Sequence, residues 1–354
     1  MTCILITGGA GFVGANLAIT LATRHPDWHV IALDNLRRRG SELNLPRLRQ
    51  AGVEVVSGDV RVAADLDAVA TIDALVECSA EPSALAGTDG RADYAVQTNL
   101  FGAYHCINRA ARDDAQLVFL STSRVYPVDA LNRLALTDTP TRFTLCDEQP
   151  SVGATSAGIS EMFPLDGPRT LYGTTKLAAE LLIAEYARDR GLRAVINRCG
   201  VIAGPWQMGK VDQGVFTHWL LSHHLRRPLT YIGYGGTGHQ VRDLLHVADV
   251  VDLVEQQLLD AGHWDGLTVN VGGGVASSLS LLETTVLCQE LTGNEVPISA
   301  LQEARAGDVP VYLSDCAKLF ATTSWRPARG ARQILVDTLA WIREHEDLVV
   351  GALH

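Results

Sequence analysis

Apolar positions along the chain follow two spacings. Short runs rich in β-branched residues have the length of strands, and between them apolar residues recur every three or four positions, as on one face of a helix. We expect strands at Cys3 to Thr7, Val30 to Leu33, Val53 to Ser57, Ala74 to Cys78, Leu117 to Ser121 and Ala194 to Arg198. We expect helices at Gly11 to Arg24, Tyr94 to Arg112 and Tyr172 to Arg190. This alternation predicts a parallel sheet with helices on both faces.

The pattern changes after about residue 200, where short helices mix with segments interrupted by glycine and proline. We therefore expect an α/β chain with two parts. Residues 1–200 form a doubly wound parallel sheet, and residues 201–354 form a smaller α/β lobe. A segment of the second part can also return to the sheet of the first part. The stretch from Ser151 to Thr170 is rich in glycine and proline and predicts a long loop, which is a candidate lid.

The first expected strand ends in a glycine turn that opens a helix. Gly8, Gly11 and Gly14 let the backbone approach a pyrophosphate, and the helix N-terminus supplies N–H groups. Asp34 ends the second strand, where a carboxylate binds both ribose hydroxyls and repels a 2′-phosphate. These features predict a Rossmann-type dinucleotide site that prefers NAD. The basic run Arg37 to Arg39 keeps NADP as the alternative.

Candidate catalytic residues lie on the third helix and at the end of the fifth strand. Tyr172 and Lys176 are four residues apart, so they share one helix face. An ammonium next to a phenol favours the phenolate, which suits a proton shuttle on a sugar hydroxyl. Thr122 follows an apolar strand at the end where ligands bind to such sheets. We expect Thr122, Tyr172 and Lys176 to act together.

The series Thr7 to Gly14, Asp34-Asn35, Asp59-Val60, Asn99, Thr122 and Tyr172-x-x-x-Lys176 resembles the extended short-chain dehydrogenase/reductase superfamily, which includes NAD-dependent epimerases and dehydratases. The resemblance covers nearly the whole chain. It implies a Rossmann domain that holds NAD tightly and a C-terminal lobe for a nucleotide-diphosphate sugar. It gives Thr122, Tyr172 and Lys176 as the catalytic triad. The cofactor contacts it implies are Gly8, Gly11, Phe12, Val13, Gly14, Asp34, Asn35, Asp59, Val60, Cys78, Ser79, Ala80, Asn99, Tyr172, Lys176 and Cys199.

Three C-terminal segments resemble the CDP-paratose 2-epimerase (CDP-tyvelose epimerase) branch. They are Asn197 to Gln207, Lys210 to Gly214 and Gly238 to His246. The substrate contacts that this resemblance suggests are Ser123, Arg124, Lys210, Gln213, Gln240, Arg242, Arg305 and Asp308. Arginines in loops flanked by glycine suit bidentate binding of a diphosphate. The chain departs from the family at Tyr126, which precedes Pro127 in place of glycine, and at Val201, where many relatives have asparagine.

The resemblance implies an enzyme that inverts C2 of a CDP-sugar such as CDP-paratose, CDP-tyvelose or CDP-glucose, through a transient 2-keto sugar. A UDP-sugar 4-epimerase is the main alternative, because it uses the same triad on another carbon. A 4,6-dehydratase needs an Asp-Glu pair after the triad threonine, and this chain has Ser123 and Arg124 there. A non-catalytic NAD-binding regulator is the alternative from another class, but such proteins typically lose the Tyr/Lys pair.

The composition of the chain indicates which partners it is not expected to bind. There are 40 acidic and 29 basic residues, so the net charge of −11 disfavours nucleic acid and anionic bilayers. No apolar run is long enough to span a membrane, and the seven cysteines and eleven histidines show no metal-ligand spacing. We therefore expect a cytoplasmic protein without a metal. Relatives commonly pair through two long helices, which here are 94–112 and 172–190, so a homodimer is expected.

Overall fold

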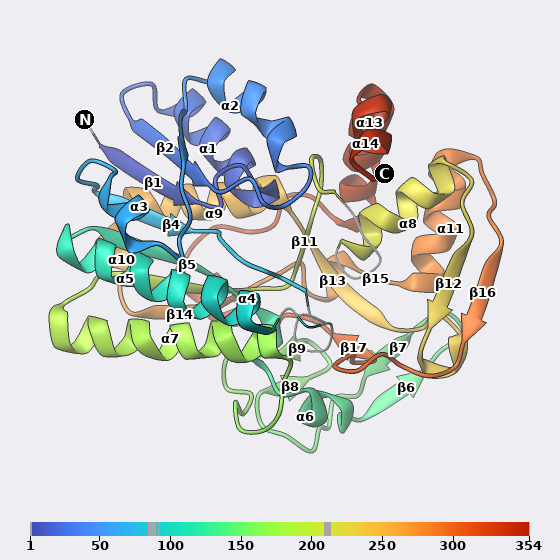
Figure 1. The fold of residues 1–354 in the computed structure, drawn as a ribbon. Coiled ribbons are helices and arrows are strands. Elements are labelled where there is room, and N and C mark those ends of the chain that lie inside the picture. The colour runs from blue at the N-terminus through green and yellow to red at the C-terminus, as the bar shows by residue number, and fades with distance from the viewer. Residues whose placement is uncertain (1, 84–89, 91, 209–213, 354) are drawn as a thin grey trace. The chain divides into compact units, whose positions relative to one another are not determined.

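The computed structural model describes residues 2–83, 90, 92–208 and 214–353 (Figure 1). The chain divides into two compact units. Unit 1 comprises Met1–Thr122, Leu171–Arg198 and Val250–Thr268. Unit 2 comprises Ser123–Thr170, Cys199–Asp249 and Val269–His354. Each unit therefore gathers segments that are far apart in the sequence.

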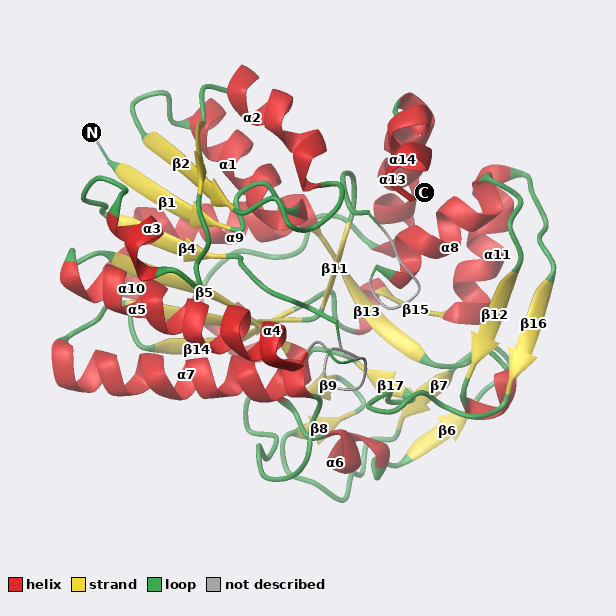
Figure 2. Cartoon of the chain, in the orientation of Figure 1, coloured by secondary structure: helices red, strands yellow, loops and turns green. Residues whose placement is uncertain are grey.

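The strands of unit 1 belong to a seven-stranded sheet (Figure 2). Its strands, in spatial order, are β14 (Leu267–Val271), β10 (Ala194–Cys199), β5 (Gln116–Thr122), β4 (Ala74–Glu77), β1 (Cys3–Thr7), β2 (His29–Asp34) and β3 (Glu54–Ser57). The pairs β3-β2, β2-β1, β1-β4 and β4-β5 are parallel. The six strands expected from the sequence are all present, with ends that differ by at most one residue. The predicted doubly wound α/β fold is confirmed.

Helices cover the sheet of unit 1. They are α1 (Phe12–Arg24), η1 (Ser41–Asn44), α2 (Leu45–Gln50), α3 (Ala63–Asp67), α4 (Ala92–Val96), η2 (Gln97–Phe101), α5 (Gly102–Arg112), α7 (Leu171–Arg190), α9 (Val247–Leu259) and α10 (Ala261–Trp264). The helix expected from Tyr94 to Arg112 consists of α4, a π-helical turn at η2 and α5. Such π turns occur often at functional sites. Helices α5 and α7 lie side by side (Figure 1), and the Tyr186 hydroxyl donates to Asn108 Oδ1 at 2.6 Å.

The core of unit 1 explains why its strands are easy to recognise. A parallel strand with helices on both faces is buried on both sides and is therefore apolar throughout. Leu5, Leu75 and Leu117 from the strands pack with Ile107 from α5 and Ile183 from α7. Each of these side chains is at most 2% exposed. This core holds the carboxyl ends of β1, β2, β4 and β5 in fixed register.

Unit 2 is built from small sheets and short helices. Its largest sheet joins β11 (Val201–Ala203), β13 (Val241–His246), β15 (Ser278–Ser280) and β17 (Val311–Tyr312). The two-stranded sheets are β12 (Leu229–Ile232) with β16 (Ile298–Leu301), β6 (Leu136–Asp138) with β7 (Phe143–Leu145), and β8 (Ala154–Thr155) with β9 (Gly158–Ile159). The helical segments are η3 (Ser123–Val125), α6 (Val128–Asn132), α8 (Val215–His224), η4 (Tyr234–Gly236), η5 (Val275–Ser277), α11 (Leu281–Thr292), α12 (Ala317–Thr322), α13 (Ala331–Glu344) and α14 (Glu346–Leu353). Phe216, Trp219 and Leu335 belong to its own apolar core.

The expectation of a long loop from Ser151 to Thr170 is wrong in its middle. The strands β8 and β9 form a short hairpin there, and Ile159 is fully buried. The Ile159 N–H donates to the Leu313 carbonyl at 2.8 Å, and the Asp315 N–H donates to the Ile159 carbonyl at 2.9 Å. Phe163 is buried and packs edge-on against the Tyr126 ring. The segment is thus anchored within unit 2, and this anchoring argues against a lid that moves as a whole.

One expectation concerned the membrane. Within residues 2–83, 90, 92–208 and 214–353, no helix has both the length and the apolar character that crossing a membrane requires.

Candidate functional site

The turn between β1 and α1 brings three stretches of backbone into close contact. Gly8 has a φ of +63°, which favours glycine. A Cβ at Gly14 would lie 2.2 Å from the Gly8 carbonyl oxygen, and one at Gly9 would lie 2.6 Å from the Cα of Ala32. A Cβ at Gly8 would lie 2.9 Å from the backbone of Cys78. Only glycine fits at these positions, so the turn packs directly on β2 and on the end of β4.

The N-terminus of α1 is arranged to accept an anion. The helix starts at Phe12 after Gly11, which has no side chain to cap it, and its first turn has no acidic residue. The N–H groups and the positive end of the helix dipole therefore remain available to a phosphate. This cradle, which any Cβ would fill, fits the pyrophosphate of a dinucleotide. The structure thus supports the positions of Gly8, Gly11, Phe12, Val13 and Gly14 in one turn.

Asp34 is held next to this turn in a fixed orientation. Its two carboxylate oxygens accept hydrogen bonds from the backbone N–H groups of Ala10, at 3.0 Å, and Leu36, at 2.8 Å. Burial raises the pKa of Asp34, and the backbone hydrogen bonds oppose this effect. A carboxylate anchored in this way at the end of β2 suits a diol such as a ribose.

Polar residues continue the site along the ends of β2 and β3. Asp59 accepts hydrogen bonds from Asn35 at 2.9 Å and from Arg61 at 2.5 Å. Its hydrogen bonds to Arg61 lower the pKa of Asp59 to about 2, although burial acts in the opposite direction. Val60 is buried beside them. The Arg37 guanidinium stacks on the Tyr94 ring at 4.1 Å, so this part of the basic run has a partner of its own.

The loop after β4 is fixed by Asn99, which lies in the π-helical turn. The Asn99 amide accepts a hydrogen bond from the Glu81 N–H at 2.7 Å and donates to the Glu81 carbonyl at 3.0 Å. It also donates to the Thr175 hydroxyl on α7 at 3.3 Å. Cys78 is partly exposed and Ser79 is buried just before this point, with Ala80 between them and Glu81. Asn99 therefore connects the loop to the helix that carries Tyr172 and Lys176.

The three candidate catalytic residues all lie in unit 1. Thr122 is the last residue of β5, and Tyr172 and Lys176 are one turn apart near the start of α7. Lys176 is buried, and its ammonium lies 4.4 Å from the centre of the Phe119 ring. The ammonium interacts electrostatically with Tyr172, and this interaction contributes to a raised pKa of Lys176 against the effect of burial. The arrangement places a buried cation where it favours a phenolate at Tyr172.

Sequence reasoning missed Glu77, the last residue of β4. Its Oε2 atom lies 2.8 Å from the Lys176 ammonium nitrogen, and both side chains are buried. The signal in the sequence is a single charged residue at the end of the apolar run Ala74 to Val76. That signal gives no partner, because Lys176 is 99 positions further along the chain.

Unit 2 gathers a second set of candidate residues. The Arg242 guanidinium lies 2.6 Å from the Asp308 carboxylate and also donates to the Val309 carbonyl. Arg124 donates to the Gly307 carbonyl at 2.9 Å. Tyr234, which the sequence did not single out, is near all three charges: burial and then Asp308 raise its pKa, and Arg242 and Arg124 lower it. Two cations and one carboxylate are thus brought together.

The other residues expected to bind substrate are not part of this charged group. Arg305 lies in the turn before Asp308. Burial lowers the pKa of His218, and the positive charge of the nearby Arg305 lowers it further. Gln240 is buried and donates to the Ile232 carbonyl at 3.1 Å. Ser123 starts η3, and Cys199 is a buried cysteine at the end of β10. Lys210 and Gln213 lie outside the described residues.

No metal centre accompanies these residues in the part of the chain that the structure describes: no three His, Cys, Asp or Glu side chains are grouped to hold an ion.

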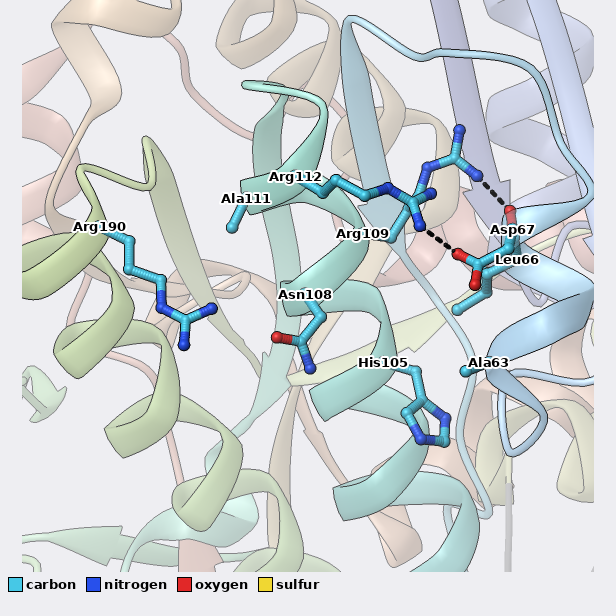
Figure 3. A pocket seen from close by; sticks show the side chains of 9 residues that line it. All are labelled: Ala63, Leu66, Asp67, His105, Asn108, Arg109, Ala111, Arg112 and Arg190. Carbon is cyan, nitrogen blue, oxygen red and sulfur yellow. Dashed lines mark hydrogen bonds and ion pairs between the residues drawn. The ribbon is translucent and has the colours of Figure 1, made fainter.

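A cavity of about 360 Å³ lies elsewhere in unit 1, against α3 and α5 (Figure 3). Its three arginines already have partners: Arg112 pairs with Asp67, Arg109 donates to the carbonyls of Val69 and Ala70, and the Arg190 guanidinium lies 4.4 Å from the centre of the Tyr186 ring. None of the candidate site residues lines it.

Comparison with known proteins identifies the family of this chain. Residues 4–272 match the model of the NAD dependent epimerase/dehydratase family. The chain belongs to this family. The nicotinamide dinucleotide expected at the glycine turn and Asp34 is therefore NAD, the cofactor of the family, and the family consists of sugar epimerases and dehydratases.

Individual relatives cover almost the whole chain. It is 29% identical to CDP-paratose 2-epimerase of Salmonella typhi over 96% of this chain and 98% of that protein. It is 30% identical to dTDP-glucose 4,6-dehydratase of Mycolicibacterium smegmatis, over 97% and 94%. The crystal structure of UDP-glucuronic acid 4-epimerase from Bacillus cereus, in complex with UDP-glucuronic acid and NAD, superposes with a TM-score of 0.79 at 19% identity over 97% of this chain and 99% of that one. This last likeness shows the fold.

Proposed function

We propose that the protein is an NAD-dependent epimerase that inverts C2 of a CDP-linked sugar. The observation that carries the proposal is the buried ammonium of Lys176 acting on Tyr172, in a chain similar over 96% of its length to a CDP-paratose 2-epimerase. A triad of this kind moves a proton at a sugar hydroxyl without a metal. The C-terminal segments that resemble the same branch support C2 as the reacting carbon.

The residues of unit 1 would hold the cofactor. The turn from Gly8 to Gly14 would bind the pyrophosphate, and Asp34 would bind the ribose hydroxyls of the adenosine. When bound, NAD accepts a hydride from the sugar carbon and returns it. The Asp59-Arg61 pair and Val60 would border the adenine, and Asn99 would keep the loop after β4 in place.

The proton transfers would be carried by Tyr172. As a phenolate it takes the proton of the C2 hydroxyl, and as a phenol it returns that proton to the 2-keto sugar. Lys176 favours the phenolate by its charge, and Thr122 orients the sugar hydroxyl. The keto sugar must present its other face before the reverse transfer, because only then is C2 inverted. No net oxidation occurs, so the cofactor is needed only as a resident group.

The nucleotide part of the substrate would be bound by unit 2. Arg124 and Arg242 are the candidates for the diphosphate, with Asp308 holding Arg242 in place. Ser123, Gln240 and Arg305 are further candidates, together with Lys210 and Gln213, which lie outside the described residues. A dehydratase is disfavoured because residues 123 and 124 carry no carboxylate to supply the acid and base of an elimination.

The partner we propose is a second copy of the chain. Phe101, Tyr104 and Leu181 are large apolar side chains that are 39–63% exposed, and they lie on η2, α5 and α7 of unit 1. Apolar groups clustered on neighbouring helices favour an interface. We propose a homodimer through these helices, in the cytoplasm.

The experiment that tests the function is a substrate panel. The protein is incubated with CDP-glucose, CDP-paratose, CDP-tyvelose, UDP-glucose and UDP-galactose, and the products are resolved by NMR. The proposal expects inversion at C2 of a CDP-sugar. Inversion at C4 of a UDP-sugar would establish the alternative 4-epimerase, and loss of water to a 4-keto-6-deoxy sugar would establish a dehydratase.

A further inference from the structure

Glu77 and Lys176 form a buried ion pair in the interior of unit 1. The two side chains are 1% and 2% exposed, and the carboxylate Oε2 lies 2.8 Å from the ammonium nitrogen. The other carboxylate oxygen, Oε1, is buried and forms no hydrogen bond of ordinary geometry in the described part of the chain, although the Ser79 N–H lies near enough to lower the pKa of the Glu77 carboxyl. An incompletely satisfied buried carboxylate is costly for folding. A buried ion pair is weak evidence for a stabilising role, because apolar residues of similar volume often replace such a pair without loss, so a function for the charge is the better explanation.

The charge of each partner depends on the other. Burial alone lowers the pKa of Lys176, yet the charge of Glu77 and its hydrogen bond, together with the field of Tyr172, raise that pKa above its ordinary value. Burial raises the pKa of Glu77, and the ammonium of Lys176 opposes this rise. Removing one member of such a pair leaves an uncompensated charge in the interior, which neutralises instead.

The other groups that face the pair do not replace Glu77. Phe119 on β5 presents the face of its ring to the ammonium. Cys78, which follows β4, adds a smaller field. Cys106 on α5 is fully buried, and burial raises the pKa of its thiol so far that the thiol is neutral at physiological pH. Thr7 on β1 is the strand partner of Glu77 and carries no charge. Among these groups, only Glu77 offers a full negative charge within hydrogen-bond distance.

We propose that Glu77 is the counter-ion that keeps Lys176 charged and oriented, so that the ammonium is available to Tyr172. Glu77 is thus a positioning residue, which acts on the proton shuttle through Lys176. This inference rests on the roles proposed above for Tyr172 and Lys176. Without Glu77, Lys176 loses its proton at lower pH, and the phenolate of Tyr172 then lacks its stabilising cation. The alkaline limb of the pH–rate profile therefore moves to lower pH.

The chain offers an unusually clear test, because it has only three lysines: Lys176, Lys210 and Lys318. Lysine labelled with ¹³C at Cε gives three NMR signals, which K210R and K318R assign. The titration of each signal is followed in the full-length protein without substrate. In the unsubstituted protein, Lys176 is expected to titrate above the ordinary lysine value of about 10.4. In Glu77→Gln its midpoint is expected to fall by about one pH unit or more, a tenfold loss of proton affinity.

Two further variants separate the proposal from a general effect of removing a buried carboxylate. Glu180 lies one turn after Lys176 on α7 and is buried against Arg198 at 2.7 Å, so Glu180→Gln is the matched control. It is expected to leave the Lys176 midpoint unchanged. Glu77→Asp keeps the charge, so we expect its Lys176 midpoint to lie much closer to that of the unsubstituted protein than the midpoint in Glu77→Gln does. An equal shift in Glu77→Gln and Glu180→Gln would overturn the proposal.

The measurement also stays informative if Glu77→Gln does not fold. In that case a Lys176 signal that shows a neutral amine at pH 7 in the unsubstituted protein would overturn the proposal by itself. The titration needs no substrate, so it is independent of the proposed reaction. If Lys176 titrates as expected but no sugar is epimerised, the proposed function fails and the counter-ion role stands. If epimerisation occurs and Glu77→Gln leaves both the Lys176 midpoint and the pH–rate profile unchanged, the counter-ion role alone fails.

Discussion

Substitution of Gly14 by alanine tests the glycine turn by steric means alone. The new Cβ would lie 2.2 Å from the Gly8 carbonyl oxygen, whereas contacts under 3.0 Å essentially never occur, so the turn or α1 must shift by about 0.8 Å. The neighbouring atom is backbone and has no rotamer through which to escape. Overpacking of this kind costs about 1–3 kcal/mol. Because each 1.4 kcal/mol is a factor of ten in affinity, we expect NAD binding to weaken about 10- to 100-fold.

The assay is calorimetric titration of NAD into protein freed of bound nucleotide, with thermal unfolding followed in parallel. Gly262→Ala is the matched control, since a Cβ there meets no atom within 4 Å and Gly262 lies in α10 of the same unit. We expect the control to bind NAD like the unsubstituted protein. Equal NAD affinity of Gly14→Ala and Gly262→Ala would refute the reasoning that the turn forms the pyrophosphate cradle.

Three further predictions concern single side chains. Tyr172→Phe keeps the ring and loses only the hydroxyl, so turnover should fall about 10²-fold or more while calorimetry still detects NAD binding; near-normal turnover would exclude Tyr172 as the acid/base. Asp34→Ala should narrow the preference for NAD over NADP in competition binding, and equal binding of the two cofactors by the unsubstituted protein would show that Arg37 to Arg39 dominate instead. Asp59 has a folded-state pKa of about 2, below its unfolded value of about 3.9, so the stability it contributes is complete above pH 4 and is lost as the pH falls towards 2. The free energy of unfolding, measured in urea, should therefore differ between the unsubstituted protein and Asp59→Asn by an amount that shrinks as the pH falls through this window. A difference that does not change with pH would contradict this prediction.

The first unit could be predicted from the sequence because its signals are local. The strands β1, β2, β4 and β5 are short apolar runs, and α1 and α7 carry apolar residues at helical spacing. The seventh strand, β14 (Leu267–Val271), was not predicted. It pairs with β10, which lies about 70 residues earlier in the chain, and nothing in its own sequence specifies that partner.

The site could be predicted as far as each residue stands in a motif. The glycine turn, Asp34 and the Tyr172-Lys176 spacing are of this kind. Glu77 belongs to no motif. The counter-ion role proposed for it can be inferred only from the folded chain, in which it lies 2.8 Å from Lys176. The hairpin at β8 and β9 was missed for a similar reason, because strands of two residues are defined by their partners and not by their own pattern.

The path of the hydride tests the central claim most directly. The protein is given a CDP-sugar deuterated at C2 and, separately, one deuterated at C4, and rate and label are followed by NMR. Provided that hydride transfer is at least partly rate-limiting, we predict a primary isotope effect from C2 deuterium only, with the label retained at C2 of the product because the hydride stays on the bound cofactor. A primary effect from C4 deuterium alone, or loss of the label to solvent, would contradict the account.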